Sequence, residues 1–392
     1  MKAKIILILG VVFLCSSTLA FSIVYTSTLD FELYKNERYL GNSKATELAS
    51  FIDVGLRVLA AQRRLSGDQP RRVFHTKQHG CLTGRLRIRS ERPNDGDRVT
   101  FAGLFDGQRQ EYDVLVRFSN GLGVSRRDSL PDVRGVAIKV FDVENRETKR
   151  HQTVDLLMTN SPIPAGRDLL EFADFMDSVS QFGPTLGLKI FSLSHKQAAE
   201  GLVQATGLLP YKVRSLATIR YWGGHPYLMG PERAMKFSLI PTETTEKSVV
   251  MLKLMGENFL RKDLLDRTRS GQLIYTFAVQ MERSPEMTPI ENNLREWLET
   301  DSPSIAVADL ILDRQDFSQA DQDQVCEDLR FTPGHYIPDH RPLSNMGRGR
   351  LFAYEASQIG RRSQSDDPGP ELVHELRLRS KVRREPAHST HY

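Results

Sequence analysis

The 392-residue chain has few cysteines, two tryptophans and little net charge. Three cysteines are too few for a disulfide framework or a cysteine-rich zinc site. Cys15 lies in an apolar N-terminal segment, which leaves Cys81 and Cys326 as the two that could pair, although nothing in the sequence supports the pair. A formal net charge of +4 gives no general attraction to nucleic acid, so we expect no nucleic-acid partner.

Long hydrophobic runs are also absent, with one exception at the N-terminus. Residues 5–25 carry no charge and follow Lys2 and Lys4, and a run of this length can span a bilayer as a helix. The lysines predict that the N-terminus stays inside and the rest is exported. Residues 18–20, Thr-Leu-Ala, would suit signal cleavage, but the apolar run continues past them, which favours a retained anchor. We therefore expect a periplasmic or membrane-anchored protein whose main domain lies outside the cytoplasm, with residues 1–25 as signal or anchor.

The rest of the chain has the composition of a globular protein, 40% hydrophobic and 26% charged, with no internal repeat. Residues 26–64 predict a linker and then an amphipathic helix, because apolar residues recur there at spacings of three and four. Residues 65–362 are expected to form one domain. Residues 363–392 are polar, basic and contain proline, and we expect them to be disordered.

Short alternating apolar runs begin at about residue 83 and predict β-strands. They are separated by Gly, Asp, Asn and Pro, and they read GRLRIRS, RVTFAGLF, YDVLVRFS, RGVAIKVFDV and TVDLLMT. A helical stretch follows, and then three more strand-like runs, AMKFSLIP, QLIYTFAVQM and SIAVADLIL. The pattern favours an α+β fold built around an antiparallel sheet or barrel.

Two stretches concentrate reactive side chains, RRVFHTKQHGCLTG at 71–84 and GRLFAYEASQIGRR at 349–362. On a helix, Arg350 and Tyr354 lie on one face. A guanidinium beside a phenol favours the phenolate. Tyrosine is one of the few side chains that bind haem iron axially. Taken alone, however, Arg-x-x-x-Tyr is more often a packing pair than a ligand site.

RLFAY resembles the proximal haem-ligand motif of the catalase family, and FTPGHYIP resembles the loop that precedes it there. RVFHTKQHG resembles the distal motif of that family, and VRFSNG resembles a strand that carries a haem-propionate arginine and a serine. PDVRGVAIKVF and VDLLMTNSPIPAGRDLLEFADF continue the match in family order. The resemblance covers about residues 65–362. It implies a catalase-like antiparallel β-barrel with surrounding helices and haem bound between the barrel and a proximal helix.

The resemblance implies haem b, with its iron, as the cofactor. Tyr354 would bind the iron with Arg350 beside it, and His75 would be the general acid–base. The other implied contacts are Ser119 as the residue that orients the histidine, Arg72, Arg117 and Arg361 as partners of the haem propionates, and Phe172 against the porphyrin. His79 and Cys81 have no implied role, and we expect them to be loop residues near the haem rim.

The sequence departs from the family pattern at three places. The distal asparagine of the family aligns with Thr159, and a one-residue bulge would return Asn160 to the pocket as the catalytic amide. Phe74 stands beside His75 where a smaller aliphatic residue is usual. Only 38 residues follow Tyr354, so the C-terminal helical domain of typical catalases is expected to be missing or reduced to a tail, as in the small catalase-related branch.

These features predict a haem-dependent hydroperoxidase of the catalase or peroxidase type, acting on hydrogen peroxide or on an organic or lipid hydroperoxide. One alternative is an isomerase of fatty-acid hydroperoxides, like the allene oxide synthases that share the fold. Another is a non-catalytic barrel that carries haem or an apolar ligand. The presence of His75, Arg350 and Tyr354 argues against it, because ligand carriage alone needs no distal acid–base. We also expect a homo-oligomer, with the membrane contacted through the N-terminal segment.

Overall fold

The computed structural model describes residues 32–66, 71–90, 100–206, 213–243, 256–318, 320–361 and 369–381. The predicted signal or anchor at 1–25 lies outside these ranges. Within them, no helix is both long enough and apolar enough to cross a membrane.

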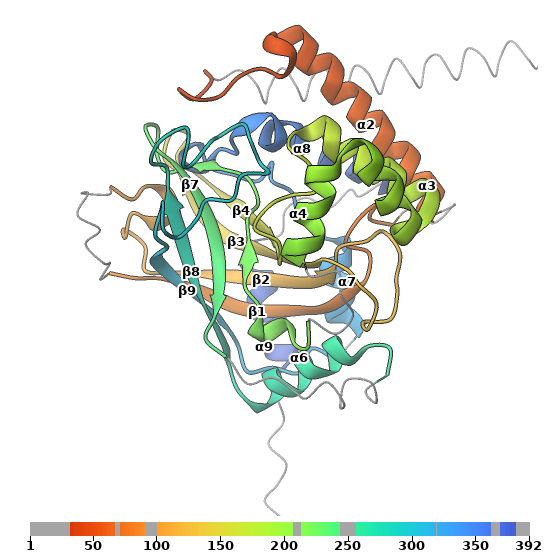
Figure 1. Cartoon of the computed structure of the whole chain (residues 1–392). Coiled ribbons are helices and arrows are strands. Elements are labelled where there is room, and N and C mark those ends of the chain that lie inside the picture. The colour runs from red at the N-terminus through yellow and green to blue at the C-terminus, as the bar shows by residue number, and fades with distance from the viewer. Residues whose placement is uncertain are drawn as a thin grey trace, which may run out of the picture.

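The strands form one antiparallel sheet that closes into a barrel (Figure 1). The order is β5-β4-β3-β2-β1-β9-β8-β7, and pairing of β5 with β7 closes the ring, while β6 lies beside β7. The strands are β1 Gln78–Ile88, β2 Glu111–Asn120, β3 Arg134–Asn145, β4 Arg150–Thr159, β5 Tyr221–Trp222, β6 Tyr227–Leu228, β7 Ala234–Pro241, β8 Leu273–Met281 and β9 Ile305–Leu312. The predicted α+β fold with an antiparallel barrel is confirmed.

Side chains alternate between the two faces of each strand, and this alternation decides where the site can form. In β2, Val116 and Phe118 are fully buried in the main core inside the barrel. The intervening Arg117 and Ser119 therefore point to the outer face of the barrel. These two polar side chains of β2 can therefore contact only the elements that pack against the outer face of the barrel.

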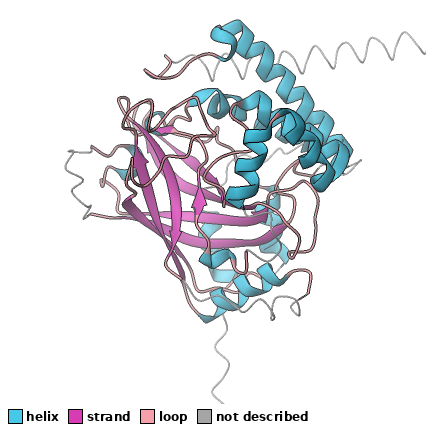
Figure 2. Cartoon of the chain, viewed as in Figure 1, coloured by secondary structure: helices cyan, strands magenta, loops and turns pink. Residues whose placement is uncertain are grey.

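A layer of helices covers part of the outer face (Figure 2). The layer consists of α2 Lys44–Ser66, α3 Leu169–Ser194 and α8 Ser344–Arg361, and α4 Lys196–Thr206 packs on α3. The other helices, α6 Phe259–Ser270, α7 Ala320–Asp328 and α9 Glu371–Arg379, pack against β1. Phe51, Val54 and Val58 recur on one face of α2 at spacings of three and four, and they share a second core with Leu169 of α3 and Phe352 of α8. Packing of these three helices on one another makes the layer a unit.

A buried ion network fixes α8 within this layer. Arg348 is fully buried and donates to Glu47 from Nε at 3.0 Å and from Nη2 at 2.8 Å. It also pairs with Glu37 of the segment before α2. Burial by itself would lower the pKa of Arg348, but these carboxylates outweigh it and the pKa is raised. The helix that carries Tyr354 is thereby tied to the N-terminal part of the domain.

The C-terminal segment is a packed helix for part of its length. Val373 and Leu376 of α9 are buried against the outer barrel face. Arg377 donates to Asp113 at 2.6 Å and to Asp313 at 2.7 Å. The prediction of a disordered tail at 363–392 is therefore wrong for residues 369–381. A single helical turn of apolar residues within a basic stretch is too short a signal to be recognised from periodicity.

Candidate functional site

A cavity of about 530 Å³ lies between the outer face of β2–β4 and the layer of α2, α3 and α8. The predicted site residues that line it are Arg72, His75, Arg117, Ser119, Phe172, Arg350, Tyr354 and Arg361. Its volume is in the range of small-molecule and cofactor sites. The structure thus brings together every predicted site residue except Asn160.

His75 is held on the barrel side of the cavity in an unusual backbone conformation. Its φ is 59°, in the left-handed region, and its N–H donates to the Gly121 carbonyl at 2.9 Å. Such conformations persist only where the surrounding structure enforces them, and they are common at functional sites. The ring Nδ1 lies 3.0 Å from Ser119 Oγ. This contact leaves Nε2 as the nitrogen that can exchange a proton with a substrate.

The charge state of His75 follows from its surroundings. Burial, and then the positive charges of Arg117, Arg350 and Arg72, lower the pKa of His75 to about 3. The imidazole is therefore neutral at any pH near 7. A neutral ring can accept a proton, as a general base must.

Tyr354 lies on the opposite wall, on α8, one turn after Arg350. The Arg350 Nη2 donates to the Tyr354 oxygen at 3.0 Å. Tyr227 also hydrogen-bonds the Arg350 side chain, and Tyr227 in turn lies 3.1 Å from His225 Nε2. Burial would lower the pKa of Arg350, but the two phenols outweigh it and raise the pKa. A lasting positive charge is therefore fixed beside the Tyr354 oxygen.

His225 and Tyr227 were missed by the sequence analysis. They lie in GGHPY, which looks like an ordinary turn. Tyr227 is more than a hundred positions before Arg350, and no periodic pattern joins them. Only the packing of β6 near α8 brings them together.

One end of the cavity carries an arginine site, made of Arg72, Arg117 and Arg361. These side chains converge on Glu327: the carboxylate lies 3.2 Å from Arg117 Nη2 and 3.9 Å from Arg72 Nε. Arg361 donates to the Glu327 carbonyl at 2.5 Å. Burial and mutual repulsion lower the pKa of Arg72 well below its usual value, and burial also lowers the pKa of Arg117 and Arg361. With three guanidinium groups and one carboxylate, the site favours an added anion with two negative charges.

The donor set fits haem. One wall offers a phenol with a cation beside it, the other offers a neutral imidazole, and one end offers two uncompensated positive charges for two carboxylates. Apolar side chains such as Phe172 and Met346 line the space between. Among the described residues, no group of three or more His, Cys, Asp or Glu side chains could hold a metal. Tyr354 would then be the iron ligand, and Arg72, Arg117 and Arg361 would hold the propionates.

The structure does not bring Asn160 into the cavity. Strands β3 and β4 pair in unbroken register from Val154 to Thr159, with Gly135 opposite Thr159, so the bulge that the prediction needed is not there. Thr159 lines the cavity. Asn160 Oδ1 instead accepts the Arg134 N–H at 2.7 Å. The alternation of side chains along the chain places the hydroxyl, and not the amide, in the distal wall.

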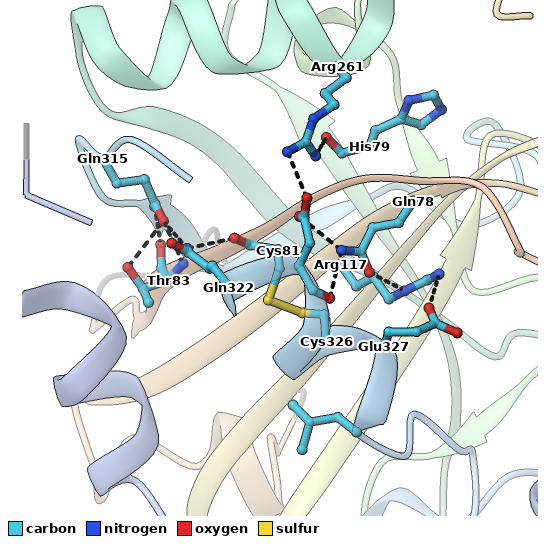
Figure 3. The surroundings of a disulfide bond; sticks show 12 residues. Gln78, His79, Cys81, Thr83, Arg117, Arg261, Gln315, Gln322, Cys326 and Glu327 are labelled. Atoms are coloured by element: carbon cyan, nitrogen blue, oxygen red, sulfur yellow. Dashed lines mark hydrogen bonds and ion pairs between the residues drawn. A yellow bond between two sulfur atoms is a disulfide. The ribbon is translucent and has the colours of Figure 1, made fainter. Parts of the chain in front are cut away.

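His79 and Cys81 belong to strand β1, and both are fully buried. The expectation that they are loop residues is therefore wrong. His79 Nε2 lies 2.7 Å from Asn120 Oδ1. Cys81 forms a disulfide with Cys326 of α7 (Figure 3). The alternation in CLTGRLRI could have shown that the strand begins before residue 83.

Phe74 contributes to the cavity wall beside His75. Its ring centroid lies 6.4 Å from that of Phe172. Phe172 is in turn 6.4 Å from Phe175. Aromatic rings thus form one apolar side of the cavity.

The fold and the cavity together define a β-barrel protein with a binding site between the barrel and a helix layer. A model of the catalase family matches residues 63–366, and the chain belongs to that family. Among solved structures, a fungal catalase is similar at a TM-score of 0.62 and 19% identity, covering 83% of this chain and 66% of that one. Catalase A from Saccharomyces cerevisiae is similar at a TM-score of 0.61 and 16% identity, covering 83% and 68%.

The chain spans about two thirds of the length of these two catalases. At such identities the similarity establishes the fold only, so the chemistry has to be argued from the residues of the site. No curated protein matches the chain in sequence.

Proposed function

We propose that the protein is a haem-dependent hydroperoxidase, which cleaves the O–O bond of hydrogen peroxide or an organic hydroperoxide. One observation carries the proposal. Tyr354 with Arg350, and His75 with Ser119, face the same cavity from two different layers of the fold. Haem held by a tyrosine supplies the redox chemistry of iron next to the peroxide.

His75 moves the proton in this reaction. Its neutral Nε2 accepts the proton of the peroxide oxygen that approaches the cofactor, and returns it to the oxygen that departs. Ser119 fixes the ring through Nδ1, at 3.0 Å, so that Nε2 keeps one direction. Because the pKa of His75 is about 3, the ring is unprotonated and ready at neutral pH.

The other residues hold the cofactor. Arg350 keeps a positive charge next to the Tyr354 oxygen, to which it donates at 3.0 Å, and Tyr354 would bind the iron. The arginine site would pair with the two propionate carboxylates of the haem. Phe172, which lines the cavity, would pack against the porphyrin.

We infer that an organic hydroperoxide is preferred over hydrogen peroxide. Thr159 offers one hydroxyl where an amide would offer both a carbonyl and two N–H donors, so a small peroxide has fewer groups to orient it. The cavity also extends along α3 and α4 past apolar side chains, including Val179, Leu188 and Val203. That extension suits an apolar substituent on the peroxide.

We also infer that the domain acts outside the cytoplasm, tethered by residues 1–25. The Cys81–Cys326 disulfide supports this, because disulfides persist in oxidising compartments and are rare in the cytosol. Labelling of intact cells with a membrane-impermeant reagent tests the location. Protection of the domain until the cells are lysed would contradict it.

The test of function uses the full chain in detergent with haem supplied. An optical spectrum of ferric haem with a tyrosine ligand, lost in Tyr354→Phe, is the expected result. Timed additions of hydrogen peroxide and of a fatty-acid hydroperoxide should show faster consumption of the latter, with turnover abolished in His75→Ala. Conversion of the hydroperoxide to an isomer without any reductant would favour the isomerase alternative. Bound haem with no turnover would favour the non-catalytic carrier. Absence of bound haem would exclude the hydroperoxidase and the isomerase and leave only a carrier of an apolar ligand.

A further inference from the structure

The disulfide joins two parts of the fold that are 245 residues apart in sequence (Figure 3). Cys81 lies in β1 and Cys326 lies in the last turn of α7. Both side chains are fully buried in an apolar cluster with Leu115, Phe141 and Leu329. A reductant in solution therefore has no direct access to either sulfur, which favours a fixed structural role over a redox switch.

The segment that begins at Cys326 holds Arg72. The Arg72 Nη2 donates to three carbonyls, those of Cys326 at 2.9 Å, Glu327 at 3.0 Å and Leu329 at 2.8 Å. A buried guanidinium needs such partners, because loss of its hydration is otherwise uncompensated. All three acceptors lie within four residues, and the first of them is a disulfide cysteine.

The same segment organises the other two members of the arginine site. Glu327 accepts from Arg117 Nη2 at 3.2 Å through its side chain, and from Arg361 at 2.5 Å through its carbonyl. Residues 326–329 thus contact all three arginines. A shift of this segment would move the whole site.

The remaining contacts of α7 are non-covalent. One of them also reaches the arginine site, because Gln78 donates to Asp323 at 3.0 Å and accepts from Arg117 Nε at 2.8 Å. Gln322 donates to the Cys81 carbonyl at 2.7 Å (Figure 3), and Asp323 pairs with Arg261 at 2.6 Å. Both lie in the half of the helix before Cys326. The disulfide is therefore the covalent tie closest to the carbonyls that hold Arg72.

We propose that Cys81 and Cys326 are a positioning pair, which fixes residues 326–329 so that the arginine site is preorganised for two carboxylates of a bound ligand. The proposal rests on the proposed function, in which those carboxylates are the haem propionates. Without the disulfide, residues 326–329 would become ordered only when the ligand binds, and the entropy lost in ordering them would weaken the binding. The disulfide would then contribute to recognition of the charged end of the ligand and not to its apolar part.

The experiment compares two ligands that differ only at that end. The full-length haem-free protein and the variant Cys81→Ala/Cys326→Ala are titrated with haem and with haem dimethyl ester, whose carboxylates carry no charge. We expect the variant to lose about tenfold in affinity for haem, as for one lost charge-assisted contact, and less than about twofold for the ester. The ratio of the two affinities is the readout, because general loosening of the fold would weaken both ligands alike.

Arg377→Gln is the matched control. It removes ties of α9 to Asp113 and Asp313 without touching residues 326–329, so it should lower stability and leave the ratio unchanged. If the alanine pair does not fold, Cys81→Ala/Cys326→Val refills the apolar cluster and takes its place.

Two results would overturn the positioning role. One is an equal loss of affinity for haem and ester, and the other is an unchanged affinity for both. Failure of the proposed function looks different, because the wild-type protein would then bind neither ligand or would bind haem without peroxide turnover.

Discussion

A Cβ atom at position 135 would lie 2.5 Å from both Cε1 and Nδ1 of the His75 ring. Gly135 in β3 is paired with Ser119 in β2, so the imidazole rests over the one position of this pair that has no side chain. The same Cβ would lie 3.1 Å from Ser119 Oγ. The position of the His75 ring thus depends on the lack of a side chain at Gly135 as much as on the hydrogen bond with Ser119 that orients the ring.

Gly135→Ala should displace the His75 imidazole and impair peroxide turnover without preventing haem binding. A displacement of about 1 Å of a catalytic group can cost about 100-fold in rate, so we expect a loss of this order in kcat/KM for peroxide. Haem affinity should change little. Gly271→Ala is the control, because a Cβ there would meet nothing within 4 Å. Full turnover in Gly135→Ala would show that the close contact does not constrain His75.

Asn160→Ala should lower stability and leave peroxide turnover nearly intact. The variant leaves the buried Arg134 N–H without its acceptor, which costs about 1–3 kcal/mol in the free energy of unfolding. Urea unfolding and kcat/KM measured on the same sample separate the two effects. Thr159→Asn, which puts an amide into the cavity, should raise the rate with hydrogen peroxide relative to an organic hydroperoxide. Loss of turnover in Asn160→Ala at unchanged stability would restore Asn160 as a catalytic residue.

His79 should make the folded state sensitive to acid. Burial lowers the pKa of His79 to about 4 in the folded protein, below the value of about 6.5 expected when unfolded. Between these values the unfolded chain binds more protons, so stability is lost as the pH falls through this window. We expect the wild type to lose about 1 kcal/mol more than His79→Gln between pH 6 and pH 5.

Urea unfolding at pH 7, 6 and 5 measures this difference between wild type and His79→Gln. The pKa of Asp132 is raised to about 6 by burial and gives a pH dependence of the opposite sign, while His75 acts in the same direction as His79. Both groups are present in the wild type and the variant, so their contributions cancel. Equal pH dependence of the two proteins would mean that His79 is protonated as readily in the folded state as in the unfolded one.

Arg348→Met should destabilise the domain strongly. It leaves Glu47 buried without its cation and Glu37 paired with Arg341 alone, and removal of one member of a buried ion pair costs about 3–5 kcal/mol. Arg379→Met provides the comparison, because Arg379 forms an exposed pair with Glu375, worth at most about 1 kcal/mol. Thermal and urea unfolding check both variants. Similar stabilities of the two would indicate that water reaches the network around Arg348.

The parts of the site that lie within one element could be predicted, Arg350 and Tyr354 from helical spacing and Arg117 and Ser119 from the resemblance to the catalase family. Arg350 and Tyr354 are four apart on α8, and they do form a hydrogen bond. Arg117 and Ser119 are two apart on β2, and both reach the cavity. The fold class followed from the alternating runs, which the closed barrel confirms.

Partners from distant elements could not be predicted in this way. Glu327 contacts Arg117 across 210 positions, and Tyr227 reaches Arg350 from a short strand with no pattern of its own. The Asn160 prediction failed for a different reason. It relied on a bulge, whereas the pleat of β4 in regular register already assigns Thr159 to the outer face. Regular alternation of side chains along β4, without a bulge, would have predicted that Thr159 and not Asn160 lines the cavity.

The cavity takes its two walls from parts of the fold with separate cores, one inside the barrel and one among α2, α3 and α8. A ligand that fills the cavity contacts both walls, so its binding free energy also stabilises the docking of the helices on the barrel. Residues of the arginine site repel one another until an anion arrives, which raises the cost of docking without it. Folding of this domain should therefore be coupled to cofactor binding. The barrel would form without the cofactor, and the helices would dock on it fully only when the cofactor binds.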